Sequence, residues 1–545
     1  MRRLPISLLI LVAAASAPSS LAAQCSASAS DTASLAPHPF ATASGVSGDR
    51  DRIAQDLGRC STRSALIRSA ASLNRPLGSG NSFRWAVVPL SLDATYNSAI
   101  PYSINDGPQF AARGVTTTIL GGVRAEAGPL SISVAPQLVY EQNRQFFVFP
   151  STTPGRNLFA SPWHSHVESA DLPLRFGDGS RKSIYPGESW IELRSGPVVV
   201  GGSTDGQWWG PGIRNALVMS DNAGGVPRLY LRSANPLATP AGDVEFQFLI
   251  GGLTESRFFD TVSTNNIRSL SAAVATLRVA FDTGLTVGVA RSVYSSASSS
   301  GSVVSHTFDV LSRWNQRPDT NGPVRTKPSD QLLSLFGRWV FPQAGVEVYG
   351  EWAKLFAPGI REMLVAPQAH QGFTVGLQWV NPLPAGRAFR LQTEATTLEQ
   401  TPPATRVAMP SFYTSQVVPQ GYTQLGQVIG AAIGPGASSQ WLAGDFMTPK
   451  WRVGAFIGRT RTEEDVLYSE ANGNSAKHDV TILSGVRAGW RAPVFDLSGE
   501  LTVARRYNYL FQDDAFNAGE TTVSAVDVQN LTLTFRLTPR SPRGP

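Results

Sequence analysis

Two adjacent tryptophans, Trp208 and Trp209, precede a Gly210-Pro211-Gly212 corner and form the part of the chain best suited to ligand chemistry. Proline fixes its own φ and lacks a backbone donor, and glycine accepts positive φ, so this segment cannot continue a helix or a central strand. A rigid corner can present large aromatic faces, which stack on the apolar C–H surfaces of sugar rings. These residue types at this spacing are suited to carbohydrate binding.

Polar side chains follow the corner closely, and Arg214 and Asn222 are the best candidates to bind sugar hydroxyls. Gln207 and Asp221 add an amide and a carboxylate nearby. Guanidinium, amide and carboxylate groups donate to or accept from hydroxyls, which complements stacking on a ring. The alternative is structural: the two rings pack the corner itself, and residue chemistry alone leaves both interpretations open.

Sequence signals for catalysis are sparse. The chain has no G-x-S-x-G, H-E-x-x-H or P-loop motif. His164 and His166 are spaced to share one face of a strand, but no third metal ligand is evident. The acidic run at 463–465 falls in a predicted loop, where solvated turn residues are the ordinary interpretation. We therefore expect no enzyme activity, no metal and no cofactor.

The N-terminus, residues 1–23, has the pattern of a cleaved secretory signal peptide. Arg2 and Arg3 precede an apolar run, and small residues follow up to Ala23. Removing the two arginines takes the formal net charge from +6 to +4, and no dense basic run remains, so nucleic acid is a poor candidate partner. We expect an exported protein of the bacterial outer membrane.

The two cysteines, Cys25 and Cys60, both lie near the mature N-terminus. An exported protein meets an oxidising compartment, which favours a Cys25–Cys60 disulfide over the alternative of two unpaired thiols. Residues 24–80 around them form an N-terminal leader. Within it we expect a short helical segment over residues 49–71, broken at Gly58.

From Phe83 onward, apolar and polar residues alternate with period two, which is typical of β-strands. With their flanks these segments run about 9–11 residues, the length of a tilted membrane-spanning strand. After the signal peptide, no run reaches the roughly 18 apolar residues of a membrane helix. The clearest alternating segments are 275–281, 285–290, 373–379, 451–457, 497–503 and 531–537.

Tight turns alternate with long irregular stretches along this part of the chain, as they do in outer-membrane barrels. The tight turns occur at 127–129, 195–197, 282–284, 342–344 and 491–493. The long stretches lie near 142–188, 204–242, 295–330, 399–445, 459–477 and 508–527. We predict an all-β fold, an antiparallel outer-membrane β-barrel of roughly 16–20 strands over residues 81–537, followed by a tail at 538–545. A lumen of that width must be plugged or must act as a channel.

The segment GGSTDGQWWGPGIRNALVMSDNAGGVP, residues 201–227, resembles the signature of the Wzi-type capsule assembly family. Residues Gly421–Phe446, GYTQLGQVIGAAIGPGASSQWLAGDF, are similar to that family's late glycine-rich loop, and Asp51–Leu57, DRIAQDL, to its opening helix. The resemblance implies an outer-membrane barrel with N-terminal helices that help to close the periplasmic side. It also implies binding of capsular or related surface polysaccharide, without catalysis.

We expect a monomeric barrel in outer-membrane lipid that holds exported polysaccharide at the cell surface, with Trp208, Trp209, Arg214 and Asn222 as contacts. The rival function is a diffusion or sugar-uptake porin. A third, a secreted hydrolase or lyase on a β scaffold, is disfavoured because the chain lacks a convincing acid–base constellation. Single-channel conductance separates the first two functions, because a plugged binding protein passes little steady current.

Overall fold

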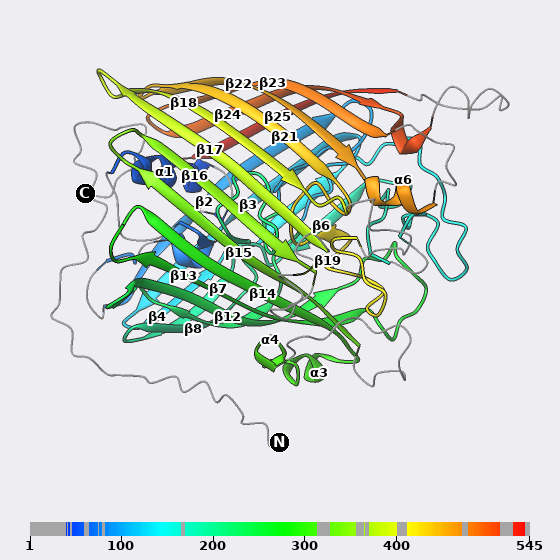
Figure 1. Cartoon of the computed structure of the whole chain (residues 1–545), viewed down its shortest axis with the longest axis horizontal. Coiled ribbons are helices and arrows are strands. Elements are labelled where there is room, and N and C mark those ends of the chain that lie inside the picture. The colour runs from blue at the N-terminus through cyan, green and yellow to red at the C-terminus, as the bar shows by residue number, and fades with distance from the viewer. Residues whose placement is uncertain are drawn as a thin grey trace.

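A closed antiparallel β-barrel of 18 strands forms the body of the molecule in the computed structural model (Figure 1). The predicted all-β outer-membrane barrel of roughly 16–20 strands is therefore confirmed. The last strand pairs with the first, so the barrel sheet closes on itself. The structure describes residues 40, 42–43, 46–58, 65–74, 76–78, 82–164, 169–312, 328–355, 365, 370–400, 411–470, 478–512 and 527–539.

Three of the 18 strands are interrupted, and each appears as two consecutive shorter strands: β4 with β5, β6 with β7, and β10 with β11. The first half of the wall consists of β2 (Arg84–Asn97), β3 (Gly114–Ala127), β4 (Leu130–Val134), β5 (Gln137–Glu141), β6 (Arg181–Tyr185), β7 (Trp190–Ser195), β8 (Val198–Ser203), β10 (Arg228–Ser233), β11 (Leu237–Thr239), β12 (Gly242–Thr254) and β13 (Ile267–Val279). The second half consists of β14 (Leu285–Ala297), β15 (Ser329–Phe341), β16 (Val346–Lys354), β17 (Gln371–Leu383), β18 (Arg387–Thr397), β21 (Ser438–Met447), β22 (Trp451–Thr462), β23 (Asp479–Arg491), β24 (Phe495–Tyr507) and β25 (Val528–Pro539).

The short turns lie at one end of the barrel, the tight-turn end, which is on the left in Figure 1. They are 128–129, 196–197, 240–241, 280–284, 342–345, 384–386, 448–450 and 492–494. The longer connections leave the opposite, long-loop end. In bacterial barrels of this type the short turns face the periplasm and the long loops face outward.

Side chains alternate across the wall as the period of two predicts. Every second position on the membrane-spanning strands carries an apolar side chain that remains exposed on the outside, where lipid would cover it. Examples from the predicted segments are Val287, Val289, Phe373, Val375, Val453, Ile457, Leu501, Val503, Leu531, Leu533 and Phe535. The intervening side chains face the lumen, where polar and charged residues are frequent.

Helices contribute little to the fold. The described helices are α1 (Val46–Asp56), α2 (Ala70–Leu73), α3 (Ser300–Val304), α4 (Asp309–Ser312), α6 (Glu464–Glu470) and the 3-10 turn η3 (Tyr509–Phe511). None of the helices in the described part of the chain is long and apolar enough to span a membrane. Figure 1 places α1 inside the tight-turn end, and α3 and α4 against the outside of the wall.

The predicted helix over residues 49–71 is right for α1 and wrong further on. α1 ends at Asp56, and the backbone at Gly58 has a φ of +67°, which breaks the helix. Ile67–Ser69 is instead the short strand β1, because it pairs antiparallel with β9 (Gln207–Trp209). A tertiary partner therefore overrides the local helical preference of this segment.

Two long connections, residues 204–227 and 411–437, turn back into the barrel and together form what we call the luminal plug. Their apolar side chains pack against inward-facing residues of the wall in one large buried cluster. That cluster includes Trp209, Leu217, Tyr413, Tyr422 and Ile429 from the plug with Leu249, Leu270 and Leu332 from the wall. The main hydrophobic core of the protein thus lies in the lumen, because the wall's own side chains cannot fill a barrel this wide.

Several predictions for the N-terminal part fall beyond the structure. The signal peptide at 1–23 and both cysteines, Cys25 and Cys60, lie outside the described residues. The signal peptide and the disulfide therefore stay predictions. Within the described part of the chain, the barrel wall begins at Arg84 and ends at Pro539.

Candidate functional site

The tryptophan pair lies deep in the luminal plug. Trp208 is 1% exposed and Trp209 is 0% exposed, because strand β9 pairs with β1 inside the barrel. Trp209 belongs to the luminal cluster, whereas Trp208 packs beside Ala216 under the guanidinium of Arg68, which lies 5.0 Å from a ring centroid of Trp208. Neither ring offers a free face to a sugar in this arrangement, so the geometry supports the packing alternative for both.

The Gly210-Pro211-Gly212 corner is the rigid turn that the sequence predicts, and its glycines are required by close approaches. The φ of Gly210 is +106°, and a Cβ there would lie 2.9 Å from the Glu351 carboxylate. A Cβ at Gly212 would lie 2.2 Å from the Asn215 carbonyl oxygen. The carbonyl of Pro211 accepts a 2.7 Å hydrogen bond from Arg52 Nη1 on α1. The corner joins the plug to the N-terminal helix.

A wall carboxylate, Glu394 on β18, holds the segment after the corner. Its two oxygens accept hydrogen bonds from the backbone N–H groups of Ile213, Arg214 and Asn215 at 2.5–3.2 Å. The hydroxyl of Tyr349 on β16 donates to the same carboxylate at 2.9 Å. Glu394 is only 2% exposed, and of the three donor residues Asn215 is buried as well. Glu394 is therefore the main polar anchor of this plug segment.

The two other predicted binding residues also make internal contacts. The Arg214 guanidinium lies 4.9 Å from the ring centroid of Trp441 on β21. The Asn222 side chain donates a 3.0 Å hydrogen bond to the carbonyl of Val428, in the second plug segment. Arg214 thus links the plug to the wall, and Asn222 links the two halves of the plug.

The second plug segment packs closely against the first, which agrees with the resemblance of both segments to one family. The hydroxyls of Tyr413 and Tyr422 each donate a 2.9 Å hydrogen bond, to the carbonyls of Leu217 and Val218 respectively. Their rings stack with centroids 6.1 Å apart. Two segments about 200 residues apart in sequence therefore form one folded unit.

An ionic network fastens α1 to the wall at the tight-turn end. Arg338 on β15 donates to Asp56 at 2.9 Å and to Glu347 on β16 at 2.5 Å. Arg52 forms an ion pair with the same Glu347, and Gln378 Nε2 donates to Asp56 at 2.5 Å. Burial, followed by the negative charge of Glu347, raises the pKa of Asp56 to about 8.

Docking of α1 should weaken as pH rises. The pKa of Asp56 is 3.8 for a free carboxyl and about 8 in the folded protein, so the folded state binds the extra proton. Stability contributed by this proton is present at low pH and is lost between about pH 4 and about pH 8. Distances between spin labels on α1 and on the 384–386 turn report whether the helix is docked. The fraction of molecules with α1 undocked should be larger at pH 9 than at pH 5. The Asp56→Asn variant should remove this difference, and an equal undocked fraction at both pH values in the unsubstituted protein would contradict it.

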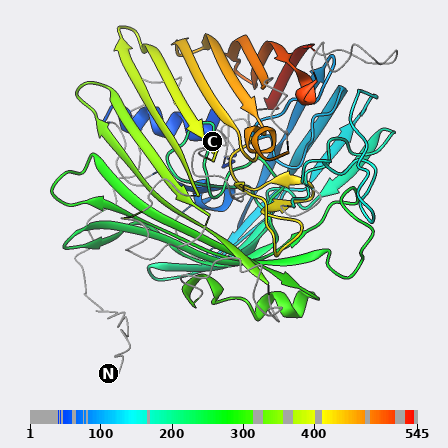
Figure 2. The ribbon, with the colours of Figure 1, turned by 45° about the vertical axis from the view of Figure 1, so that its right-hand side comes forward.

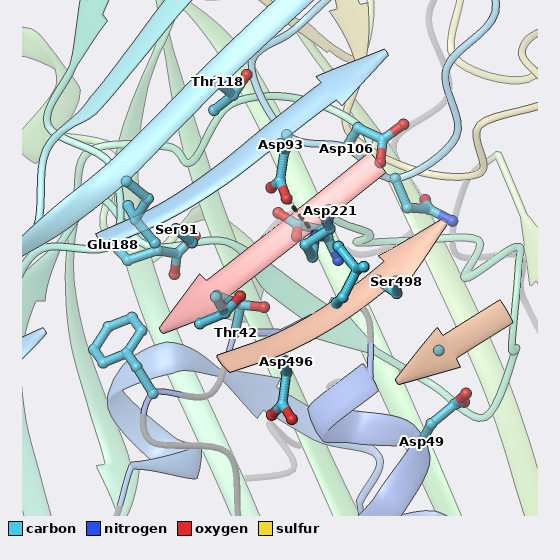
Figure 3. Close-up of a pocket in the computed structure, with 18 of the residues that line it drawn as sticks. Thr42, Asp49, Ser91, Asp93, Asp106, Thr118, Glu188, Asp221, Asp496 and Ser498 are labelled. Atoms are coloured by element: carbon cyan, nitrogen blue, oxygen red, sulfur yellow. Dashed lines mark hydrogen bonds and ion pairs between the residues drawn. The ribbon is translucent and has the colours of Figure 1, made fainter. Parts of the chain in front are cut away.

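A cavity of about 600 Å³ lies between the plug and the tight-turn end, and we call it the vestibule (Figure 3). Its walls carry many hydrogen-bonding groups from β2, β3, β24 and β25. Asp93 accepts a 2.6 Å hydrogen bond from Arg536 Nε, and Asp106, Glu188 and Asp221 face the same space. Burial raises the pKa of Asp106, which lies in the loop between β2 and β3. The vestibule can bind hydroxyls, but the plug separates it from the long-loop end.

The structure also brings together aromatic residues that sequence reasoning missed, at the long-loop end. We call Phe147, Phe149, Trp163 and Phe511 the outer aromatic cluster; all four are half-buried. Ring centroids lie 5.1 Å apart for Phe147–Phe149, 6.2 Å for Phe149–Trp163 and 5.7 Å for Trp163–Phe511. The Tyr509 hydroxyl donates to the Phe147 carbonyl at 2.9 Å, which ties the two loops together. The available sequence signal was the FFVFP run, residues 146–150, within a long polar loop.

Charged side chains border this cluster. Arg506 donates to Asp479 through two 2.7 Å hydrogen bonds, whereas Arg505, paired with Asp527 at 2.8 Å, shares the outward face of β24 with Leu501 and Val503. His164, next to Trp163, makes a 2.7 Å contact with Glu463 through Nε2, and His166 lies outside the described residues. Aromatic faces beside guanidinium and carboxylate groups are the combination that suits a sugar. The combination of residue types found around Trp208 and Trp209 in the sequence therefore also occurs at this cluster.

Comparison with known proteins adds a family. The sequence profile described as capsule assembly protein Wzi matches residues 104–444, more than half of the chain. No curated protein sequence matches the chain. Among solved structures, the chain is similar to Wzi of Escherichia coli, described as an outer-membrane protein involved in group 1 capsule assembly and a carbohydrate-binding β-barrel. The TM-score is 0.51 at 12% identity, over 82% of this chain and 84% of that chain, which shows a shared fold.

Other outer-membrane barrels are less similar. The outer-membrane protein OpdK of Pseudomonas aeruginosa gives a TM-score of 0.37 at 9% identity, over 83% of this chain and 98% of that chain. The outer-membrane channel DcaP of Acinetobacter baumannii gives a TM-score of 0.33 at 8% identity, over 84% of this chain and 98% of that chain. Both TM-scores are too low to carry an argument about function.

Proposed function

Because the chain belongs to the capsule assembly protein Wzi family, we propose that it binds capsular or related surface polysaccharide and holds it at the bacterial cell surface. The observation that carries this proposal is the family match over residues 104–444, which includes both segments of the luminal plug. The protein acts as a monomer in outer-membrane lipid, after export and removal of residues 1–23. It binds without catalysis.

The luminal plug supports this function over a diffusion or sugar-uptake porin. A porin needs an aqueous path through its lumen. Here a hydrophobic cluster, anchored by Glu394 and by the tyrosines Tyr413 and Tyr422, occupies that space. Purified protein in planar bilayers should pass little steady current. A large, steady single-channel conductance would favour the porin instead.

The outer aromatic cluster is our candidate for the glycan contact, in place of the buried tryptophan pair. Its half-buried rings lie at the long-loop end, on the side of the plug where a surface polysaccharide would be. The neighbouring Arg506, whose guanidinium lies 4.7 Å from the ring centroid of Tyr509, carries positive charge that an acidic glycan would complement. For Trp208, Trp209, Arg214 and Asn222 we propose an indirect role: they keep the plug folded and so hold the loops around the cluster in place.

A glycan array followed by affinity measurement tests this assignment. Stacking on one ring is worth on the order of 1 kcal/mol, so the Trp163→Ala and Phe511→Ala double variant should bind its glycan about tenfold more weakly or worse. Trp339→Ala is the matched control, because Trp339 is an exposed tryptophan at the tight-turn end of β15, outside the vestibule. Unchanged affinity in the folded double variant would reject the cluster. Absence of any glycan binding by the unsubstituted protein would reject the function itself.

A further inference from the structure

A polar patch interrupts the apolar outer surface of the barrel near the long-loop end. On β13, β14 and β15, the luminal positions are fixed by Leu270, Ala272, Ala290, Tyr294 and Leu332, which belong to the luminal cluster. Alternation along the strands therefore turns the intervening residues outward. Those residues are Ser271, Arg291, Ser295 and Gln331, which are all 4% exposed or less. Polar groups on the lipid face of a barrel are costly unless something covers them.

The cover is the segment that contains α3 and α4, residues 300–312, which we call the outer hairpin. Its backbone satisfies the patch: the Ser271 hydroxyl donates to the Thr307 carbonyl at 2.7 Å, and Arg291 donates to the Val310 carbonyl. Arg291 also donates to Gln331 at 2.6 Å. The Ser295 hydroxyl donates to Asp309 at 3.1 Å. The hairpin is thus fitted to this part of the wall by hydrogen bonds rather than resting on it loosely.

The opposite face of the outer hairpin carries large apolar side chains, with exposed Ser305 and Ser312 beside them. Val304, Phe308 and Leu311 are 59%, 67% and 58% exposed, whereas Val303 and Val310 are buried against the wall. The Phe308 ring also stacks on Phe248 of β12, with centroids 6.1 Å apart. Figures 1 and 2 show the two green helices outside the barrel, along its wall. A segment with polar contacts inward and large apolar side chains outward is built for an apolar surrounding.

We propose that the outer hairpin lies in the outer leaflet of the membrane, with Val304, Phe308 and Leu311 among the lipid acyl chains. The occupant is lipid because this face continues the apolar belt of the same strands: Val287, Val289 and Leu335 are outward-facing and exposed further toward the tight-turn end. The position of the hairpin along the barrel axis agrees with this placement. Its contact residue Ser295 lies two residues before β14 ends at Ala297, on the long-loop side. The hairpin thereby shields Arg291 from lipid, a role separate from glycan binding.

Spin-label accessibility in lipid nanodiscs tests this placement. Spin labels are attached to single cysteines introduced at Val304, Phe308 and Leu311, in a chain that also carries Cys25→Ser and Cys60→Ser. These labels should collide with oxygen more often than with a water-soluble nickel chelate. The reference for lipid is a label at Val289, and the reference for water is a label at Asp178, whose side chain is 64% exposed in the long loop between β5 and β6. We expect the oxygen-to-nickel ratio at the three hairpin sites to match that at 289 and to exceed that at 178 several-fold.

Two outcomes would overturn the proposal. A nickel-dominated ratio like that at 178 would place the hairpin in water, and protection from both reagents would indicate a protein partner or a second copy of the chain. If the cysteine-free chain does not fold, a photoreactive benzophenone side chain at Phe308 in the chain with its natural cysteines gives the same answer. Crosslinking to lipid supports the placement, whereas crosslinking to protein or to neither refutes it.

Discussion

Replacing both Trp208 and Trp209 with alanine should open the barrel to ions while leaving its wall intact. Removing a fully buried tryptophan costs about 3–5 kcal/mol, because the side chain leaves a cavity in a packed core. Both rings serve the plug, and the strand pairs of the wall do not involve them. We expect heat-modifiable migration on a gel to persist, and single-channel recordings to show a conductance that the unsubstituted protein lacks.

The double variant Trp208→Phe with Trp209→Phe is the matched control. Neither indole N–H has a hydrogen-bond acceptor among the described residues. Phenylalanine removes these unpaired buried donors while keeping most of the apolar volume, so the two effects partly offset each other. This variant should stay closed to ions. An alanine double variant that remains closed, with normal heat modifiability, would show that the rings are not needed for the plug.

The second large effect is expected from Glu394→Ala. This change leaves the backbone N–H groups of Ile213, Arg214 and Asn215 and the hydroxyl of Tyr349 without their common acceptor. Each buried donor left unpaired costs about 1–3 kcal/mol, so the plug segment after the corner should detach from the wall. Hydrogen exchange of residues 207–227 should rise strongly, and glycan affinity should fall if the plug positions the outer loops.

Glu394→Gln grades this effect, because a glutamine side chain keeps one acceptor oxygen and loses the charge. Its exchange rates should lie between those of the unsubstituted protein and of the alanine variant. Glu500→Ala provides the control, since Glu500 is a wall carboxylate on β24 that accepts from Thr502 on its own strand. If Glu500→Ala loosens residues 207–227 as much as Glu394→Ala does, the specific anchoring role of Glu394 is wrong.

The sequence by itself determined the barrel. Alternation along segments such as 373–379 and 497–503 is a local property, because neighbouring residues in a strand point to opposite faces. Turn residues are local signals as well, and the tight turns near 128–129, 196–197 and 492–494 lie where the sequence predicts them. The rigid Gly210–Gly212 corner was predictable for the same reason, since proline and glycine restrict or free the backbone whatever surrounds them.

Only the tertiary structure decided which way the long connections turn. The sequence leaves open whether Trp208 and Trp209 are accessible or packed, and pairing of β9 with β1, 140 residues away, draws them into the lumen. The outer aromatic cluster combines Trp163 with Phe511, and the shielding of Arg291 depends on a hairpin that folds outward. The direction of a loop depends on partners that are distant in sequence. In a wide barrel, aromatic side chains can lie in the lumen or on the outer face. Period and turn chemistry carry no information about that choice.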